Sequence, residues 1–186
     1  MTTQAARGSN NKWRVIGWSL AAALLMLPLL AMQVTSEVNW DETDFIAAGI
    51  MLAVAGGLVE LGARAKSGYF RAGVAVAVLT AFLLVWVNLA VGFLGSEDNP
   101  ANLMFLGVLT TALAGAILVR FRAAAMSGVM ATTAAAQVLA GAVGLAFGWA
   151  SPGGQGVYEV VMGSSGFGVL WLASAWLFSR AAAKTA

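Results

Sequence analysis

Long apolar stretches separated by short charged segments are the feature that most restricts what this chain can form. A transmembrane helix needs roughly 20 mostly apolar residues to cross the hydrocarbon layer of a bilayer. Hydrophobic residues make up 60% of the chain and charged residues only 10%, which is too little polar surface for a soluble domain of this size. About six stretches have the required length: they are Trp13–Met32, Phe45–Ala63, Ala72–Leu94, Leu103–Val119, Met126–Trp149 and Tyr158–Ser179. The sequence therefore predicts an all-α, polytopic transmembrane bundle of about six helices.

The charges in the gaps between these stretches alternate in sign. Basic residues lie at both chain ends and in the second and fourth gaps, whereas acidic residues lie in the other gaps, with Glu60 as the exception. Cytoplasmic loops of membrane proteins are enriched in Lys and Arg, so both termini are expected to be cytoplasmic. The outer segments are then Gln33–Asp44, Gly95–Asn102 and Ala150–Val157. The net charge of +2 includes no long basic run, so nothing predicts nucleic-acid binding.

A single transmembrane domain is expected over residues 13–180. Residues 1–12 are polar and lack periodicity, which predicts a disordered cytoplasmic N-terminus, and residues 181–186 form a short cytoplasmic tail. Basic residues precede the first apolar stretch, as they do in a signal peptide. That stretch is longer than a signal-peptide core, and no good Ala-x-Ala cleavage site follows it. We therefore expect it to remain as a transmembrane helix.

The chain contains no cysteine and no histidine, which excludes several kinds of chemistry. Haem held by His or Cys, iron–sulfur clusters, ordinary zinc sites and Ser–His proteolysis all need residues that are missing. No phosphate-binding GxxxxGK[ST] motif occurs, and every aspartate lies in or beside an outer loop rather than within a helix. We expect no catalytic set, no metal and no cofactor.

The outer acids are the largest group of candidate binding residues. Asp41 and Asp44 precede the second helix, and Glu97 and Asp98 lie in the second outer loop. Clustered carboxylates suit a hard cation, but the spacing matches no calcium-loop motif. A structural interpretation explains more of them, because Asp41 can cap a helix with Asp44 at its third position. Asn99, which precedes a proline, is likewise typical of a helix N-cap.

The polar candidate residues within the predicted spans are Glu60, Asn88 and Gln137. An ionisable residue inside a span is a functional candidate. Glu60, however, lies near the inner end of its helix, four residues before Arg64, where the two side chains can pair. Asn88 and Gln137 are expected either to hydrogen-bond across helices or to line a polar path or lipid-headgroup pocket.

Two mid-span tryptophans, Trp86 and Trp171, admit two interpretations. They either fill space between helices or flank a hydrophobic ligand, and an indole N–H in either setting needs a hydrogen-bond partner. Space filling is the favoured interpretation.

Small residues that recur at four-residue steps predict close helix contacts. Lipid provides no hydrophobic drive for helix association, so small residues that allow close approach matter. The longest series lies in the fifth span and consists of Gly128, Thr132, Ala136, Ala140, Gly144 and Gly148. We expect such faces to pack inside the bundle or to bind a protein partner or a second copy of the chain, with lipids around them.

Three short stretches of the chain resemble segments of known proteins. The residues Asn39-Trp40 before the second helix, Trp86-Val-Asn88 and above all Ser96-Glu-Asp-Asn-Pro-Ala-Asn102 resemble those of a set of small bacterial multi-pass membrane proteins to which no activity is attached. The likeness extends over most of the chain. It implies a bacterial inner-membrane location and a compact helical bundle, and it transfers no activity.

These observations favour a non-catalytic integral membrane protein, an accessory subunit that binds a partner or lipid. The competing function is a small transporter or channel for a cation or polar solute, which would need Glu60, Asn88 and Gln137 to face one cavity. An enzyme acting on lipid is the third hypothesis. It would require two of the outer acids to converge in a cleft at the level of the membrane.

Overall fold

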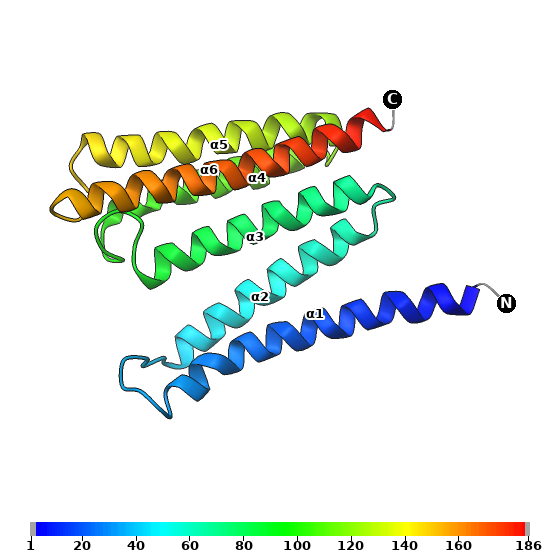
Figure 1. Ribbon diagram of the computed structural model, residues 1–186, viewed down its shortest axis with the longest axis horizontal. Helices are drawn as coiled ribbons and strands as arrows, with labels where there is room; N and C mark the ends of the chain where they lie inside the picture. The colour runs from blue at the N-terminus through cyan, green and yellow to red at the C-terminus, as the bar shows by residue number, and fades with distance from the viewer. Residues whose placement is uncertain (1–2, 185–186) are drawn as a thin grey trace. The chain divides into compact units, whose positions relative to one another are not determined.

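All regular secondary structure in the described part of the chain is helical. The structure, a computed structural model, describes residues 3–184, with side chains from residue 12 onward. No strand occurs among these residues, and six helices are long and apolar enough to cross a membrane. The helices are α1 (Thr3–Ala31), α2 (Glu42–Ala63), α3 (Gly68–Ala90), the short 3-10 helix η1 (Pro100–Leu103), α4 (Met104–Leu118), α5 (Ala123–Ala146) and α6 (Gly154–Ala183) (Figure 1). The predicted all-α fold is confirmed. The cytoplasmic placement of the termini stays a prediction.

Most observed helix ends lie within four residues of the predicted ones, and two of the differences bear on the fold. α1 begins at Thr3 rather than at Trp13, so the segment expected to lack regular structure is helical from Thr3 onward. α3 ends at Ala90 rather than at Leu94. The chain leaves the helix there because Gly92 adopts a φ of +72°, a left-handed conformation that glycine tolerates without strain.

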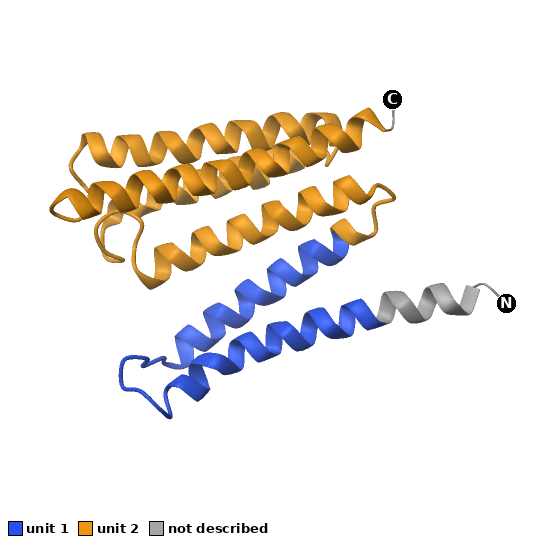
Figure 2. Cartoon of the chain, in the orientation of Figure 1, with its two compact units in different colours: residues 1–61 blue, residues 62–186 orange. Residues whose placement is uncertain are grey.

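The chain divides into two compact units, residues 1–61 and residues 62–186 (Figure 2). The domain predicted over residues 13–180 is thus made of two parts, and the difference between them lies in packing. Ala48 is the single buried hydrophobic residue described in unit 1, whereas all the others belong to unit 2. The apolar pattern predicts transmembrane helices in both units alike. It does not show the difference in packing, because it measures affinity for the membrane rather than for neighbouring helices.

Unit 1 is a hairpin of α1 and α2. The two helix backbones approach each other closely at very few points, so the contact is made by side chains. Trp18 of α1 lies over Gly56 of α2, where an added Cβ would come within 3.0 Å of the indole ring. Further along the hairpin, Leu25 reaches Gly49, at 3.9 Å from such a Cβ. The hairpin is therefore bridged by large side chains rather than tightly packed.

Unit 2 is a bundle of α3, α4, α5 and α6 in which α6 packs along both α3 and α5, and α5 also packs along α4 (Figure 1). The α3–α6 contact is tight because Gly73 lies under the ring of Phe178, and an added Cβ would be 3.2 Å from that ring. The Ser174 hydroxyl, on α6, donates a hydrogen bond to the Gly73 carbonyl at 2.9 Å. Small residues thus allow close approach in this unit, as membrane helices require.

The small-residue series predicted for the fifth span does not face its neighbours along its whole length. Ala140 and Gly144 are buried, whereas Gly128, Thr132 and Gly148 are exposed. The reason is geometric, because a step of four residues advances the helix by about 40° beyond a full turn. Over the full series this drift carries the end members away from the contact face. The buried face of α5 follows a mixture of three- and four-residue steps instead: Met126, Met130, Thr133, Ala134, Gln137, Ala140, Gly141 and Gly144.

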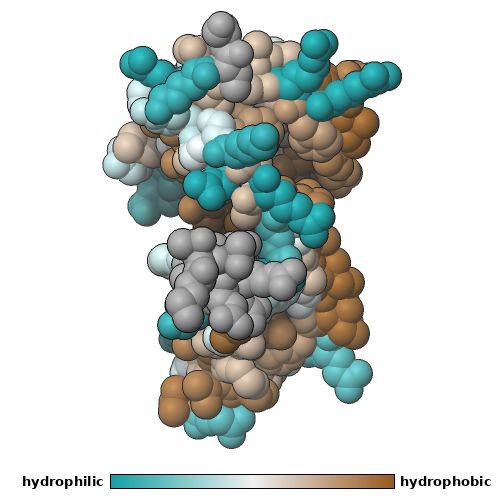
Figure 3. Space-filling view, turned by 90° about the vertical axis from the view of Figure 1, so that its right-hand side faces the viewer, coloured by the Kyte–Doolittle hydropathy of each residue, from teal (hydrophilic) through white to brown (hydrophobic). Residues whose placement is uncertain are grey.

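The outer surface of unit 2 has the distribution expected of a protein in a bilayer. Leu113, Leu139 and Val169 are large, apolar and exposed along the middle of the helices. Hydrophilic side chains gather instead over the end of the unit at which α6 finishes (Figure 3). Because exposed apolar area of this kind is costly in water, it supports burial of these flanks in lipid.

Candidate functional site

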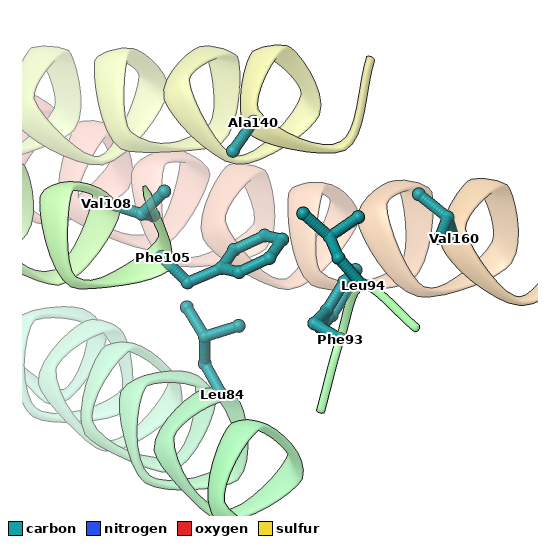
Figure 4. Packing of buried hydrophobic residues seen from close by; sticks show 7 residues of the cluster. All are labelled: Leu84, Phe93, Leu94, Phe105, Val108, Ala140 and Val160. Carbon is teal, nitrogen blue, oxygen red and sulfur yellow. The ribbon is translucent and has the colours of Figure 1, made fainter. Parts of the chain in front are cut away.

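The loop between α3 and η1 closes one end of unit 2. This plug loop, residues 91–99, turns Phe93 and Leu94 into the bundle, where both are buried. The Phe93 ring centre lies 4.3 Å from that of Phe105 in α4. Leu84 of α3 belongs to the same apolar cluster, and Figure 4 shows these side chains converging between the helices. Phe93 and Leu94, which hydropathy assigns to the third span, therefore lie in a loop and fill this end of the bundle.

Two glycines make room for the plug loop. Gly144 of α5 lies against Leu94, and an added Cβ there would be 2.8 Å from the Leu94 Cδ1 atom. Gly163 of α6 lies against Phe93, with 2.8 Å from such a Cβ to the Phe93 Cζ atom. Atoms this close have to move, so the two positions accept little beyond glycine while the loop is seated.

Asn102 fixes the conformation of the plug loop. Its Oδ1 atom accepts hydrogen bonds from the backbone N–H groups of Phe93 and Leu94, at 3.0 and 2.8 Å. Its Nδ2 atom donates to the Ser96 carbonyl at 2.7 Å. One amide thus satisfies two backbone donors and one acceptor that the loop leaves outside regular structure. Asn102 is a structural residue that sequence reasoning did not single out by itself.

Asn99 joins the plug loop to the loop between α5 and α6. Its Nδ2 atom donates to the carbonyls of Leu94 and Trp149, at 2.9 and 3.3 Å, while its Oδ1 atom caps the start of η1. The Ser151 hydroxyl adds a hydrogen bond to the Gly95 carbonyl at 3.1 Å. The predicted cap at Asn99 is confirmed, and these hydrogen bonds join the two loops.

The outer acids act in capping or are exposed. The Asp44 N–H donates to Asp41 Oδ1, and the Asp41 N–H donates to Asp44 Oδ2, both at 3.0 Å, which is the predicted reciprocal cap at the start of α2. Glu97 and Asp98 are exposed on the plug loop. Across residues 3–184, no three acidic side chains gather as a metal ion would require. Capping therefore accounts for the first pair.

Glu60 is held by two side chains of α1. Arg14 makes a two-pronged ion pair with it, Nε to Oε1 at 2.9 Å and Nη2 to Oε2 at 3.0 Å. The Trp18 indole N–H donates to the same Oε1 atom at 2.8 Å, and its ring covers Gly56 one turn earlier on α2. We call Arg14, Trp18, Gly56 and Glu60 the hairpin clamp. The sequence predicts a pairing of Glu60 with Arg64, which lies just past the end of α2, and that prediction gives no hint of the contact with α1.

The hairpin clamp predicts an energetic coupling between Arg14 and Glu60. Glu60 keeps 25% of its side-chain exposure and Arg14 keeps 61%, so the coupling free energy is expected to be about 0.5–1 kcal/mol. Arg14→Gln, Glu60→Gln and the double variant form the cycle, measured by SDS-driven unfolding in mixed micelles. The two single changes should not add, since either one removes the pair. Strict additivity, or the same non-additivity between Glu60→Gln and Arg122→Gln, a change in unit 2, would contradict the clamp.

Gln137 lies at the centre of unit 2 without a hydrogen-bond partner among the described residues. It is fully buried, and both of its amide atoms are unpaired. Ser164 Oγ and Trp171 Nε1 on α6 are also buried and unpaired within the described chain. Asn88 differs, because its Nδ2 atom donates to the Leu84 carbonyl at 2.7 Å and only its Oδ1 atom lacks a described partner.

The unpaired atoms of α5 and α6 share one helix interface. An added Cβ on Gly141 would be 2.8 Å from the Cβ of Ser164. An added Cβ on Gly168 would be 3.2 Å from the side chain of Val138, the residue after Gln137. These contacts align Gln137 with Gly168, about one turn from both Ser164 and Trp171. We call Gln137, Ser164 and Trp171 the polar layer. Its unpaired groups cost stability, since a buried polar group without a partner costs about 1–3 kcal/mol.

The polar residues that a transport path would need have different surroundings. Glu60 is bound by α1 in unit 1, Asn88 bonds to its own helix, and Gln137 lies between α5 and α6 in unit 2. The contacts that the structure shows for each residue are therefore separate. The clamp and the plug loop hold helices together, the polar layer lies unpaired between α5 and α6, and none of the three presents a nucleophile next to a base.

Comparison of the chain with protein-family models, with curated proteins and with solved structures finds no match. The resemblance to small bacterial membrane proteins, and the inner-membrane location that it implies, therefore stay predictions. The packing within each unit is the basis for the function proposed below.

Proposed function

We propose that this protein is a non-catalytic subunit of a membrane assembly and that its α1–α2 hairpin binds a transmembrane helix of a partner protein. Helices in lipid associate through close packing and polar contacts, because lipid tails are as apolar as the side chains. The hairpin has little close packing of its own, and its polar contacts are those of the clamp. A second helix against the hairpin would supply the missing packing. The charge alternation supports cytoplasmic termini, and the resemblance supports a bacterial inner membrane.

The open side of α2 is the surface proposed for the partner. Nothing lies within 4 Å of a Cβ added at Gly57, and Ala53, one turn earlier, is exposed. Gly57 lies about 100° around the helix from Gly56, which the clamp tryptophan covers. Small residues four apart on an open face allow another helix to approach closely. This open small-residue face beside a lightly packed hairpin is the observation that carries the proposal.

Cross-linking from Gly57 tests the proposal. The chain contains no cysteine, so Gly57→Cys provides a unique attachment point for a short photoreactive group in native membranes. We expect one discrete adduct whose mass is that of the chain plus a single partner. The control is Leu106→Cys on α4, a position that is also apolar in surroundings and 60% exposed. An identical adduct from both positions, lipid adducts alone, or only a dimer of the chain would refute the proposed partner.

A further inference from the structure

The end of unit 2 at which α3 begins and α6 ends carries two cations that rest on aromatic rings. The Arg180 guanidinium carbon lies 5.2 Å from the ring centre of Trp176, and the Lys184 ammonium nitrogen lies 4.7 Å from that of Tyr69. The two rings meet edge to face, with their centres 6.5 Å apart. These four residues, Tyr69, Trp176, Arg180 and Lys184, form one cationic cluster.

Tight packing between α3 and α6 holds the cluster in place. Directly behind it, the rings of Phe70 and Phe178 meet edge to face at 5.1 Å. One turn further into the bundle, the buried Ser174 hydroxyl bonds to the Gly73 carbonyl. Trp176 and Arg180 lie on α6, and Lys184 is the C-cap residue directly after it; the three are spaced by four residues, so they lie along neighbouring turns of one helix side. The packed end of α6 therefore presents both cations.

No described acid balances the positive charge of the cluster. Within the described chain, neither Arg180 nor Lys184 makes an ion pair, and both are exposed. A ring face attracts a cation but takes up few of its N–H donors, so those donors stay free for an anion. Arg forms paired hydrogen bonds with phosphate oxygens, and Lys adds a point charge.

An apolar surface leads away from the cluster along α6. Trp176 is 53% exposed, and Leu172, one turn further from the chain end, is 52% exposed. Aromatic rings with an apolar body and a polar tip are enriched at the membrane–water boundary, and basic sites there bind anionic headgroups. The cations at the helix end are placed to meet an anionic headgroup, and the open apolar face beside them is placed to meet the acyl chains of the same phospholipid.

We propose that the cationic cluster binds a phosphate group, carried either by an anionic phospholipid or by a soluble phosphate. Arg180 and Lys184 hold the phosphate oxygens, while Tyr69 and Trp176 keep the two cations in position. The site belongs to unit 2 alone. It goes beyond the partner-binding function proposed for the hairpin and does not depend on it.

The test is lipid retention by the purified full chain, counted by native mass spectrometry. The probes are dioleoyl phosphatidylglycerol, dioleoyl phosphatidylcholine and inorganic phosphate. We expect about one phosphatidylglycerol per chain, and at least about tenfold weaker retention in the Arg180→Gln/Lys184→Gln variant. Phosphatidylcholine should bind more weakly, because its headgroup has no net charge. Arg120→Gln/Arg122→Gln is the matched control, since it removes two exposed charges from the same end of unit 2 and should retain lipid as the wild type does.

Two further measurements complete the test. The first identifies the source of the phosphate, and the second controls for loss of folding. Displacement of the lipid by millimolar inorganic phosphate would assign the site to a soluble phosphate, and persistence would assign it to the lipid. The charge-preserving variant Arg180→Lys/Lys184→Arg should keep binding to within about threefold, which separates loss of charge from loss of folding. Equal retention by the double Gln variant and the wild type, or equal losses in the double Gln variant and the matched control, would overturn the proposal.

Discussion

Replacing Asn102 by alanine is expected to destabilise unit 2 by about 2–4 kcal/mol. The change removes the acceptor for the N–H groups of Phe93 and Leu94 and the donor to the Ser96 carbonyl. A backbone donor left without a partner inside the bundle costs more than the net value of one hydrogen bond. SDS-driven unfolding in mixed micelles, followed by circular dichroism, measures the change in the free energy of unfolding.

Two controls in the same segment sharpen this prediction. Glu97→Ala and Asp98→Ala alter exposed residues of the plug loop and should each change stability by less than about 0.5 kcal/mol. Asn102→Asp keeps an oxygen for both N–H groups and loses only the donor, so an intermediate effect is expected. If Asn102→Ala is as mild as Glu97→Ala, the amide does not hold the plug loop.

Replacing Gln137 by methionine is expected to stabilise unit 2 by about 1–2 kcal/mol. Methionine has a similar length and an unbranched side chain, so it fills nearly the same space without an amide. The wild-type residue is fully buried with both amide atoms unpaired in the described chain, and the substitution removes that cost. The same unfolding measurement gives the sign directly.

The matched variant Gln137→Ala should have the opposite effect. It also removes the amide, but it leaves a void between α5 and α6, and such voids cost about 2 kcal/mol or more. A gain with methionine and a loss with alanine would show that volume, not polarity, is what the bundle needs at this position. Destabilisation by methionine would show that the amide of Gln137 has a partner in the membrane, such as a trapped water.

The features that sequence predicted are those with local signals. The helices follow from apolar length alone, and each of the six predicted spans corresponds to one helix. The cap between Asp41 and Asp44 and the cap at Asn99 depend on residues two or three positions apart, so their spacing is visible in the chain. Charge alternation assigns a side of the membrane to each gap, which is a separate property from the fold.

The features that sequence missed depend on contacts between distant residues. Arg14 and Glu60 are 46 positions apart, and only the matching i, i+4 pairs at Arg14/Trp18 and Gly56/Glu60 could have suggested that they meet. The first part of the plug loop, up to Leu94, is predicted as part of the third span because Phe93 is as apolar as a helical residue would be. Hydropathy cannot distinguish a side chain buried in a helix from one that a loop inserts into the bundle.

Binding of a second protein by the α1–α2 hairpin would be visible in the mass of the intact assembly. The chain would be extracted from its native membrane in a mild detergent and weighed by native mass spectrometry, as the wild type and as Gly57→Leu. We expect a complex with one other protein at fixed stoichiometry for the wild type and its loss in Gly57→Leu, because the leucine side chain would occupy the open face of α2. A wild-type chain that is found alone, or only with copies of itself, would show that the hairpin binds no partner protein.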